Sequence, residues 1–186
     1  MSARGGLLDS RAMERRRRVR AAIAAILLMT SVASAQEVTE PALKAAFIYS
    51  FMKFTEWPEP LPASDPFVIC VLNDPAVAGA LERTIKGREF AGRRMNVSIE
   101  APGPKARCNV LYVSKVTASQ GSELISALRD SPVLTISDLE WFTGAGGMAQ
   151  LFYEQGRLRF NIGLAAVKRS KLLMSSKLLV LAKRYE

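Results

Sequence analysis

The stretch Phe67-Val68-Ile69-Cys70-Val71-Leu72-Asn73-Asp74-Pro75 contains the pattern that decides the fold. Its first six residues are apolar without alternation, which is typical of a strand buried on both faces, as in a parallel sheet. Asp74 and Pro75 then provide a helix N-cap and a first-turn proline. The pattern therefore predicts a strand over 67–73 that leads into a helix over 75–85.

The same succession of strands and helices recurs along the chain. We expect strands over 94–99, 108–114 and 132–137, with a helix over 119–129 between the last two and another over 41–57 ahead of them all. Strands that alternate with helices indicate parallel βαβ units. The predicted fold is therefore a three-layer α/β sandwich with a mostly parallel sheet.

The C-terminal part of the sequence has a different pattern. Residues 148–153 and 158–162 flank a Gln155-Gly156 turn and predict a β-hairpin. A long helix is expected over 164–183. It has more apolar residues than one packed face can bury, the surplus being Leu172, Leu173, Leu179 and Val180. Two interpretations stay open: the helix lies deep in the sandwich, or these residues contact a partner or a second copy of the chain.

The first 35 residues have the organisation of an export signal. A basic segment from Met13 to Arg20 precedes an apolar run and then Ala33-Ser34-Ala35, which is the order found in secretory signal peptides. We expect cleavage after Ala35 and a single domain over 36–186. An uncleaved anchor is the alternative, but the apolar run is shorter than the ~20 residues of a membrane span. We therefore expect no membrane insertion of the mature chain.

The charge and the composition exclude several classes of function. The formal net charge is +9, but residues 1–35 contain seven Arg and only two acidic residues, so residues 36–186 carry +4. The basic excess belongs mostly to the export segment and gives little support to nucleic-acid binding. The chain has no histidine. This excludes Ser-His-Asp triads, Cys-His pairs and histidine-ligated zinc.

Cys70 and Cys108 are the only two cysteines. In an oxidising compartment an even number of cysteines predicts a disulfide. A buried free pair and a metal site are the alternatives, and two thiols without histidine make a poor metal site. If the strands over 67–73 and 108–114 are neighbours, the disulfide joins two central strands of the sheet.

Polar residues follow the predicted parallel strands, at the edge where α/β sheets bind ligands. The candidate crevice consists of Asn73, Asp74, Ser114, Lys115, Ser137 and Asp138. The same residue types are ordinary caps and turn formers, so a structural role is the alternative. Asp74, Asp138 and Glu140 are candidate catalytic carboxylates, but their spacing places no two of them together. We therefore expect no enzyme activity, no cofactor and no metal.

Several stretches resemble the YfiR-like family. They include Lys44-Ala45-Ala46-Phe47-Ile48-Tyr49, Glu56-Trp57-Pro58, the two cysteine strands, Gly146-Gly147-Met148, Gly156-Arg157-Leu158-Arg159-Phe160 and Ser175-Ser176-Lys177-Leu178-Leu179. The matches cover nearly all of residues 43–185 in order. This chain departs from the family at Ser50 and Gly163, where Asn is usual. The second departure puts the local geometry, or a ligand contact, in question.

The resemblance implies a periplasmic protein with a Rossmann-like fold that forms a homodimer. It also implies that the protein represses an inner-membrane diguanylate cyclase through the periplasmic sensor region of that enzyme, which lowers cyclic-di-GMP and biofilm formation. Cysteine oxidation, which is tied to folding in the family, would fall on Cys70 and Cys108. The alternative function is a periplasmic small-molecule sensor that acts upstream of a histidine kinase or another membrane signalling protein.

Overall fold

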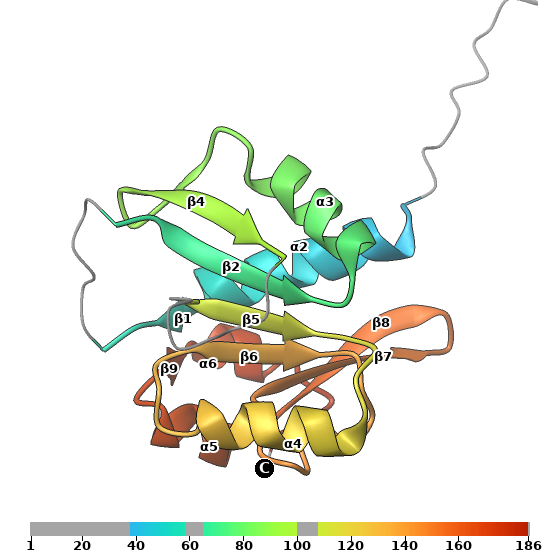
Figure 1. Ribbon diagram of the computed structural model, residues 1–186. Coiled ribbons are helices and arrows are strands. Elements are labelled where there is room, and N and C mark those ends of the chain that lie inside the picture. Colours follow the sequence, from blue (N-terminus) through green and yellow to red (C-terminus); the bar gives the residue numbers. More distant parts are fainter. Residues whose placement is uncertain (1–37, 59–64, 100–107, 186) are drawn as a thin grey trace, which may run out of the picture. The chain divides into compact units, whose positions relative to one another are not determined.

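The computed structural model describes residues 38–58, 65–99 and 108–185 (Figure 1). The predicted export segment lies outside the described residues. The main sheet has eight strands in the order β10-β8-β7-β6-β5-β2-β4-β3. Across the part of the chain that is described, no helix combines the length and the apolar character needed to cross a membrane.

Four parallel strands form the centre of this sheet. In spatial order they are β4 (Arg93–Ser98), β2 (Phe67–Leu72), β5 (Val110–Val113) and β6 (Leu134–Ser137). Helix α3 (Pro75–Ile85) follows β2, and α4 (Ala118–Ala127) separates β5 from β6. The predicted βαβ units are therefore confirmed. The chain first extends the sheet from β2 to β4 and then from β2 to β5 on the other side.

Local sequence signals fix where these two helices begin. The Asp74 side chain accepts a hydrogen bond from the Val77 N–H at 3.2 Å, and Pro75 occupies the first turn of α3. Thr117 and Gln120 form a capping box at the start of α4. Each helix thus begins where a side chain satisfies an N–H group that has no partner within the helix.

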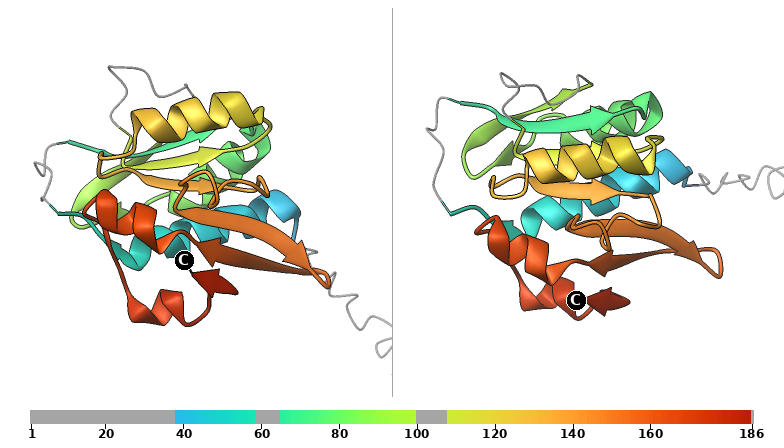
Figure 2. Two further views of the ribbon diagram at one scale, coloured as in Figure 1. Left: turned by 90° about the horizontal axis from the view of Figure 1, so that it is seen from below. Right: turned by 60° about the horizontal axis from the view of Figure 1, so that its bottom comes forward.

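The two faces of the sheet carry cores of different size. Side chains alternate along a strand, so Phe67, Ile69 and Val71 of β2 point to one face and Cys70 to the other. On the first face, α3 and α2 (Glu40–Lys53) pack into the larger core. On the second face, α4 covers a smaller cluster that contains Cys70. Figures 1 and 2 show α4 on the opposite side of the sheet from α2.

The predicted hairpin is formed by β7 (Ala149–Glu154) and β8 (Arg157–Ile162). Its turn residues Gln155 and Gly156 have φ angles of 50° and 73°, as a type I′ turn requires. Strand β7 also pairs in parallel with the end of β6, so the hairpin extends the main sheet. Short strands complete the structure: β3 (Glu89–Phe90) pairs with β4, and β1 (Thr55–Glu56) forms a separate two-stranded ribbon.

The long helix predicted over 164–183 is wrong. That segment forms α5 (Leu164–Arg169), β9 (Leu173–Met174), α6 (Ser176–Leu179) and β10 (Arg184–Tyr185). Helix α5 ends because Lys171 adopts a φ of 59°, outside the right-handed helical region. Strand β9 pairs with β1, and Ser175 then caps α6 by accepting the Lys177 N–H. Pairing with a distant strand therefore prevails over the helical spacing of the leucines.

The α/β class and the mostly parallel sheet are confirmed, but the Rossmann-like assignment is not supported. A Rossmann fold repeats βαβ units with helices on both faces. Here residues 138–148, which connect β6 to β7, contain turns and no regular helix. Strand β8 is antiparallel to β7, and β10 returns parallel to β8 at the sheet edge. The half of the sheet that contains β7, β8 and β10 is therefore not built from repeated βαβ units.

Cys70 and Cys108 form the predicted disulfide. Cys70 lies in β2 and Cys108 lies just before β5, with their Cα atoms 5.7 Å apart. Both side chains are buried in the smaller cluster on the face covered by α4. Because β2 and β5 are neighbours, the bond links a central strand to the residues that lead into the next one.

Candidate functional site

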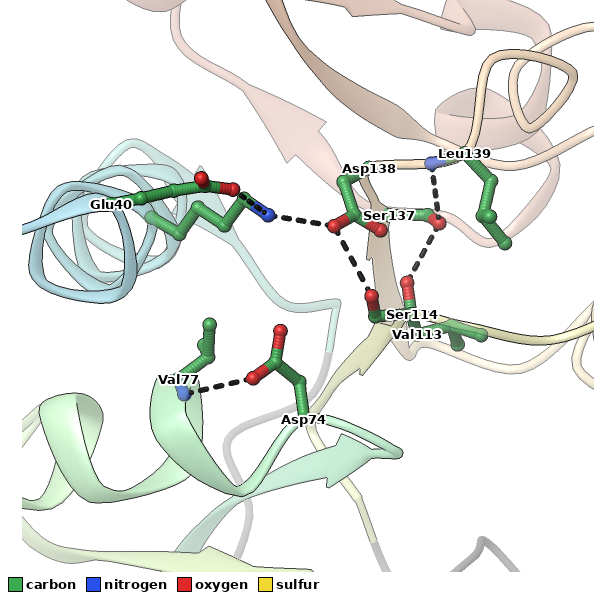
Figure 3. Close-up of polar contacts among 9 residues, drawn as sticks. Glu40, Asp74, Val77, Val113, Ser114, Ser137, Asp138 and Leu139 are labelled. Carbon is green, nitrogen blue, oxygen red and sulfur yellow. Dashed lines mark hydrogen bonds and ion pairs between the residues drawn. The ribbon is translucent and has the colours of Figure 1, made fainter.

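The carboxyl edge of the central sheet brings together four of the six residues predicted to line a crevice. Asp74 follows β2, Ser114 follows β5, Ser137 is the last residue of β6, and Asp138 comes directly after it. Figure 3 shows the side chains of Asp74, Ser114 and Asp138 converging at this edge. The Ser114 hydroxyl donates to Asp138 Oδ2 at 3.1 Å. The Ser137 hydroxyl donates to the Val113 carbonyl at 2.7 Å.

The other two predicted residues do not join this cluster. Asn73 and Lys115 are exposed and adopt φ angles of 61° and 52°. They occupy the tight turns by which the chain leaves β2 and β5. For these two residues the structure therefore agrees with the alternative of ordinary turn formation.

A lysine from α2, not predicted as part of the site, occupies the centre of this edge. Lys44 Nζ lies 2.7 Å from Asp138 Oδ2 and 2.6 Å from Glu40 Oε1. Lys44 is 7% exposed although it carries a charge. It lies one helical turn before Ile48 and two before Phe51, both of which are buried. The sequence signal for Lys44 is a cation on the buried face of a predicted helix, where a charged side chain needs a partner.

The electrostatics of the cluster favour the charged forms of both partners. Burial lowers the pKa of Lys44, but its hydrogen bonds to Asp138 and Glu40 and their negative charges outweigh that effect and raise it above the ordinary value. Burial alone would raise the pKa of Asp138, but the hydrogen bonds and the charge of its neighbours, Lys44 first, lower it. The pair is therefore ionised across the physiological range.

Two buried oxygen atoms in the cluster have no hydrogen-bond partner among the described residues: the Tyr112 hydroxyl and Asp138 Oδ1. Burial and the charge of Asp138 raise the pKa of Tyr112 well above its usual range, so the phenol stays protonated. A neutral hydroxyl beside a carboxylate oxygen is a donor next to an acceptor. A small adjustment of either side chain, or one water molecule, would satisfy both atoms.

The carboxylates at this edge make caps and ion pairs. Asp74 caps α3, Asp138 is paired with Lys44, and Glu140 is exposed beside a different cavity. Among the described residues no group of three or more His, Cys, Asp and Glu side chains is arranged to hold a metal ion. The Lys44–Asp138 pair instead attaches the first turns of α2 to the ends of β5 and β6.

A separate cavity of about 460 Å³ lies between α5, the end of β8 and the loop before β7. Gln150 and Asn161 line it, and Gln150 Oε1 accepts hydrogen bonds from Thr143 and Asn161 at 3.2 and 3.4 Å. Asn161 Oδ1 is buried without a partner in the described part of the chain. Arg169 and Arg184 also line the cavity. Sequence reasoning did not identify this cavity, because its residues come from four separate elements.

Gly163, one of the two departures noted from the sequence, also lines this cavity. A Cβ atom on Gly163 would lie 2.4 Å from the Gly147 carbonyl oxygen. The glycine therefore permits a close backbone contact between the start of α5 and the loop before β7. Any larger residue at position 163 would require this backbone contact to shift.

The four residues predicted to contact a partner fall into different environments. Leu172 is buried at 1% exposure and Leu179 is half-buried, so both belong to the protein interior. Leu173 and Val180 are 66% and 81% exposed. The single helix expected to carry all four residues does not form, because α5 ends at Arg169 and α6 begins only at Ser176. Leu173 and Val180 remain candidates for an interaction surface.

A family model described as YfiR/HmsC-like matches residues 41–183 of the chain. The match begins in the first turn of α2 and ends just before β10. It therefore includes both cysteines, the ion pair of Lys44 and Asp138, and the cavity residues Gln150 and Asn161.

Proposed function

Because the chain belongs to the YfiR/HmsC-like family, we propose that it represses a membrane-bound diguanylate cyclase from the periplasm. The family is one of periplasmic regulators of such cyclases, and this membership carries the proposal. In the proposed mechanism, the protein binds the periplasmic sensor region of the cyclase and holds the enzyme inactive. Cyclic-di-GMP in the cytoplasm is then low until the protein is released.

Three features support a regulator that works by contact in an oxidising compartment. The Cys70–Cys108 disulfide joins a central strand to the residues that lead into the next one, and such bonds persist outside the cytoplasm. At the sheet edge, Asp74 caps a helix and Asp138 forms an ion pair with Lys44. Residues 1–35 have the order of a signal peptide, and we propose that cleavage after Ala35 releases the mature chain.

The proposal is tested by deleting the gene and measuring cyclic-di-GMP and biofilm mass. We expect both to rise, and to return to their original level when the full chain is restored. A chain lacking residues 2–35 provides the control, because it stays in the cytoplasm and should not restore repression. Unchanged cyclic-di-GMP after deletion would refute the proposal in this form. Copurification of the exported protein with a membrane cyclase identifies the partner. The elution volume of the exported protein alone in size-exclusion chromatography tests the proposed homodimer.

The cavity beside Asn161 favours a second candidate function, the binding of a small molecule that modulates a membrane signalling protein. Its buried acceptor Asn161 Oδ1 lacks a partner, and a ligand with an N–H or O–H group would supply one. Titration calorimetry with candidate metabolites tests this function. Heat that disappears in Asn161→Leu supports it, whereas no heat with any metabolite of suitable size counts against it. Both functions hold together if the ligand changes the affinity for the cyclase.

A further inference from the structure

The charge of the exported chain is divided very unevenly along its length. Residues 36–154 contain eleven Lys and Arg against fourteen Asp and Glu. Residues 155–186 contain eight Lys and Arg and one acidic residue, Glu186. Such asymmetry indicates a surface that binds an anionic partner. The net charge of residues 36–186 is only +4 because acidic residues elsewhere offset the excess of Lys and Arg in the C-terminal segment.

The same C-terminal segment contains most of the exposed apolar side chains. Of the eight large hydrophobic residues that are exposed in the described parts of the chain, four lie between Leu173 and Tyr185. Leu173, Val180, Leu181 and Tyr185 are 61–81% exposed. Exposed apolar residues that occur singly need no explanation, but here four occur within thirteen residues of sequence.

Short-range structure keeps these groups together. Lys177 and Leu181 are four residues apart across α6 and the turn after it, where the Val180 N–H donates to the Ser176 carbonyl. Arg184 and Tyr185 follow at once in β10, the last strand of the sheet. In both views of Figure 2 these red elements lie together at one end of the molecule. We call the group Lys177, Val180, Leu181, Arg184 and Tyr185 the C-terminal surface.

The cations of the C-terminal surface are available for an external partner. Lys177 and Arg184 are exposed, and neither forms an ion pair with another described residue. Lys183 differs, because its Nζ lies 3.1 Å from Glu154 Oε1. The exposed apolar residues lie on a turn and on an edge strand, and they line no apolar groove among the described cavities. Protruding apolar groups among cations are typical of peripheral binding to lipid headgroups.

We propose that the C-terminal surface adsorbs to anionic phospholipid headgroups. Lys177 and Arg184 contact phosphate groups, while Val180, Leu181 and Tyr185 enter the boundary between headgroups and acyl chains. Tyrosine is favoured at that depth because one end of its side chain is apolar and the other polar. Adsorption would hold the protein at a membrane surface without insertion of a spanning segment. Adsorption is measured without any cyclase. The result therefore tests this proposal independently of the proposed repression.

The test is cosedimentation of the purified exported protein with vesicles. Vesicles of phosphatidylglycerol and phosphatidylethanolamine should bind it at low salt, and binding should weaken as salt rises. Vesicles of phosphatidylcholine alone should bind it much less. The double variant Lys177→Gln, Arg184→Gln should lower the partition coefficient roughly 25-fold, at about fivefold for each cation. The double variant Val180→Ser, Leu181→Ser should lose the binding that persists at high salt.

A matched control lies at the opposite edge of the sheet. Lys86 follows α3 and Arg94 lies in β4 beside β3, and both are exposed. The variant Lys86→Gln, Arg94→Gln has the same net charge as the first variant and should bind within about twofold of the unmodified protein. Urea unfolding of every variant establishes that each is folded. The two C-terminal double variants test separately the charged residues and the apolar residues of the C-terminal surface.

Three results would overturn the proposal. The first is no binding to phosphatidylglycerol vesicles at low salt. The second is an equal loss of binding in the control variant, which would make the effect one of net charge. The third is tight binding to polyglutamate without binding to anionic vesicles, which would assign the C-terminal surface to an acidic protein partner instead.

Discussion

At the residue scale, the buried ion pair between Lys44 and Asp138 determines how α2 is attached to the sheet. Replacing Lys44 with Met keeps the aliphatic stem but removes the cation that pairs with the Asp138 carboxylate among the described residues. We expect the free energy of unfolding to fall by about 2–4 kcal/mol, because removal of one partner leaves a buried charge uncompensated. Urea denaturation measures this. Lys183→Met is the control, since its pair with Glu154 is exposed and should contribute less than about 1 kcal/mol. Equal effects of the two variants would contradict the prediction.

The same pair predicts how stability depends on pH. The pKa of Asp138 is lowered in the folded state, so its contribution is complete above the unfolded value of 3.8 and is lost as pH falls through the folded pKa. The pKa of Lys44 is raised, so its contribution is complete below 10.5 and is lost as pH rises through the folded pKa. In Asp138→Asn the dependence of unfolding free energy on pH below 3.8 should be weaker. An unchanged acid dependence would show that other carboxylates dominate it.

At the element scale, the junction between β8 and α5 depends on the absence of a side chain at Gly163. Gly163→Ala places a Cβ atom 2.4 Å from the Gly147 carbonyl oxygen, and backbone must move to relieve that contact. We expect a loss of about 1–3 kcal/mol in unfolding free energy. Gly79→Ala in α3 is the matched control, because its Cβ would meet only Arg83 Nη1 at 3.6 Å. That variant should be neutral or slightly stabilised, since alanine is favoured inside a helix. Loss of stability in both variants to the same extent would refute the steric explanation.

The elements that could be predicted are those whose signals are local. Continuous apolar runs gave β2, β5 and β6, and Asp74 with Pro75 marked the start of α3. The two-residue strands β1 and β9 have no periodic signal, and they exist because residues 55–56 meet residues 173–174 across the fold. The same pairing replaced the predicted C-terminal helix. Leucine spacing alone does not distinguish one long helix from a succession of short helices and a short strand. Both arrangements can bury the same residues.

At the scale of the whole molecule, the site was only partly predictable because its members are distant in sequence. The rule that polar residues gather at the carboxyl ends of parallel strands placed Asp74, Ser114 and Asp138 correctly. It did not reveal that Lys44, 94 residues before Asp138, would fill that edge. The cavity near Asn161 likewise requires knowledge of how the hairpin, α5 and the loop before β7 are arranged. A helix cap can be predicted from a few adjacent residues. A contact between residues that are distant in sequence has no such local signal.

The disulfide gives the whole domain a stability that should depend on its compartment. Cys70 and Cys108 close a loop with a sequence separation of 38, for which the chain-entropy model gives about 4 kcal/mol. We therefore expect reduction of the purified protein to lower its free energy of unfolding by about that amount, measured in urea with and without reductant. Cys70→Ala with Cys108→Ala should lose at least as much, because both side chains are buried, and should no longer respond to reductant. A reduced protein as stable as the oxidised one would contradict this. In that case the bond would have no stabilising role.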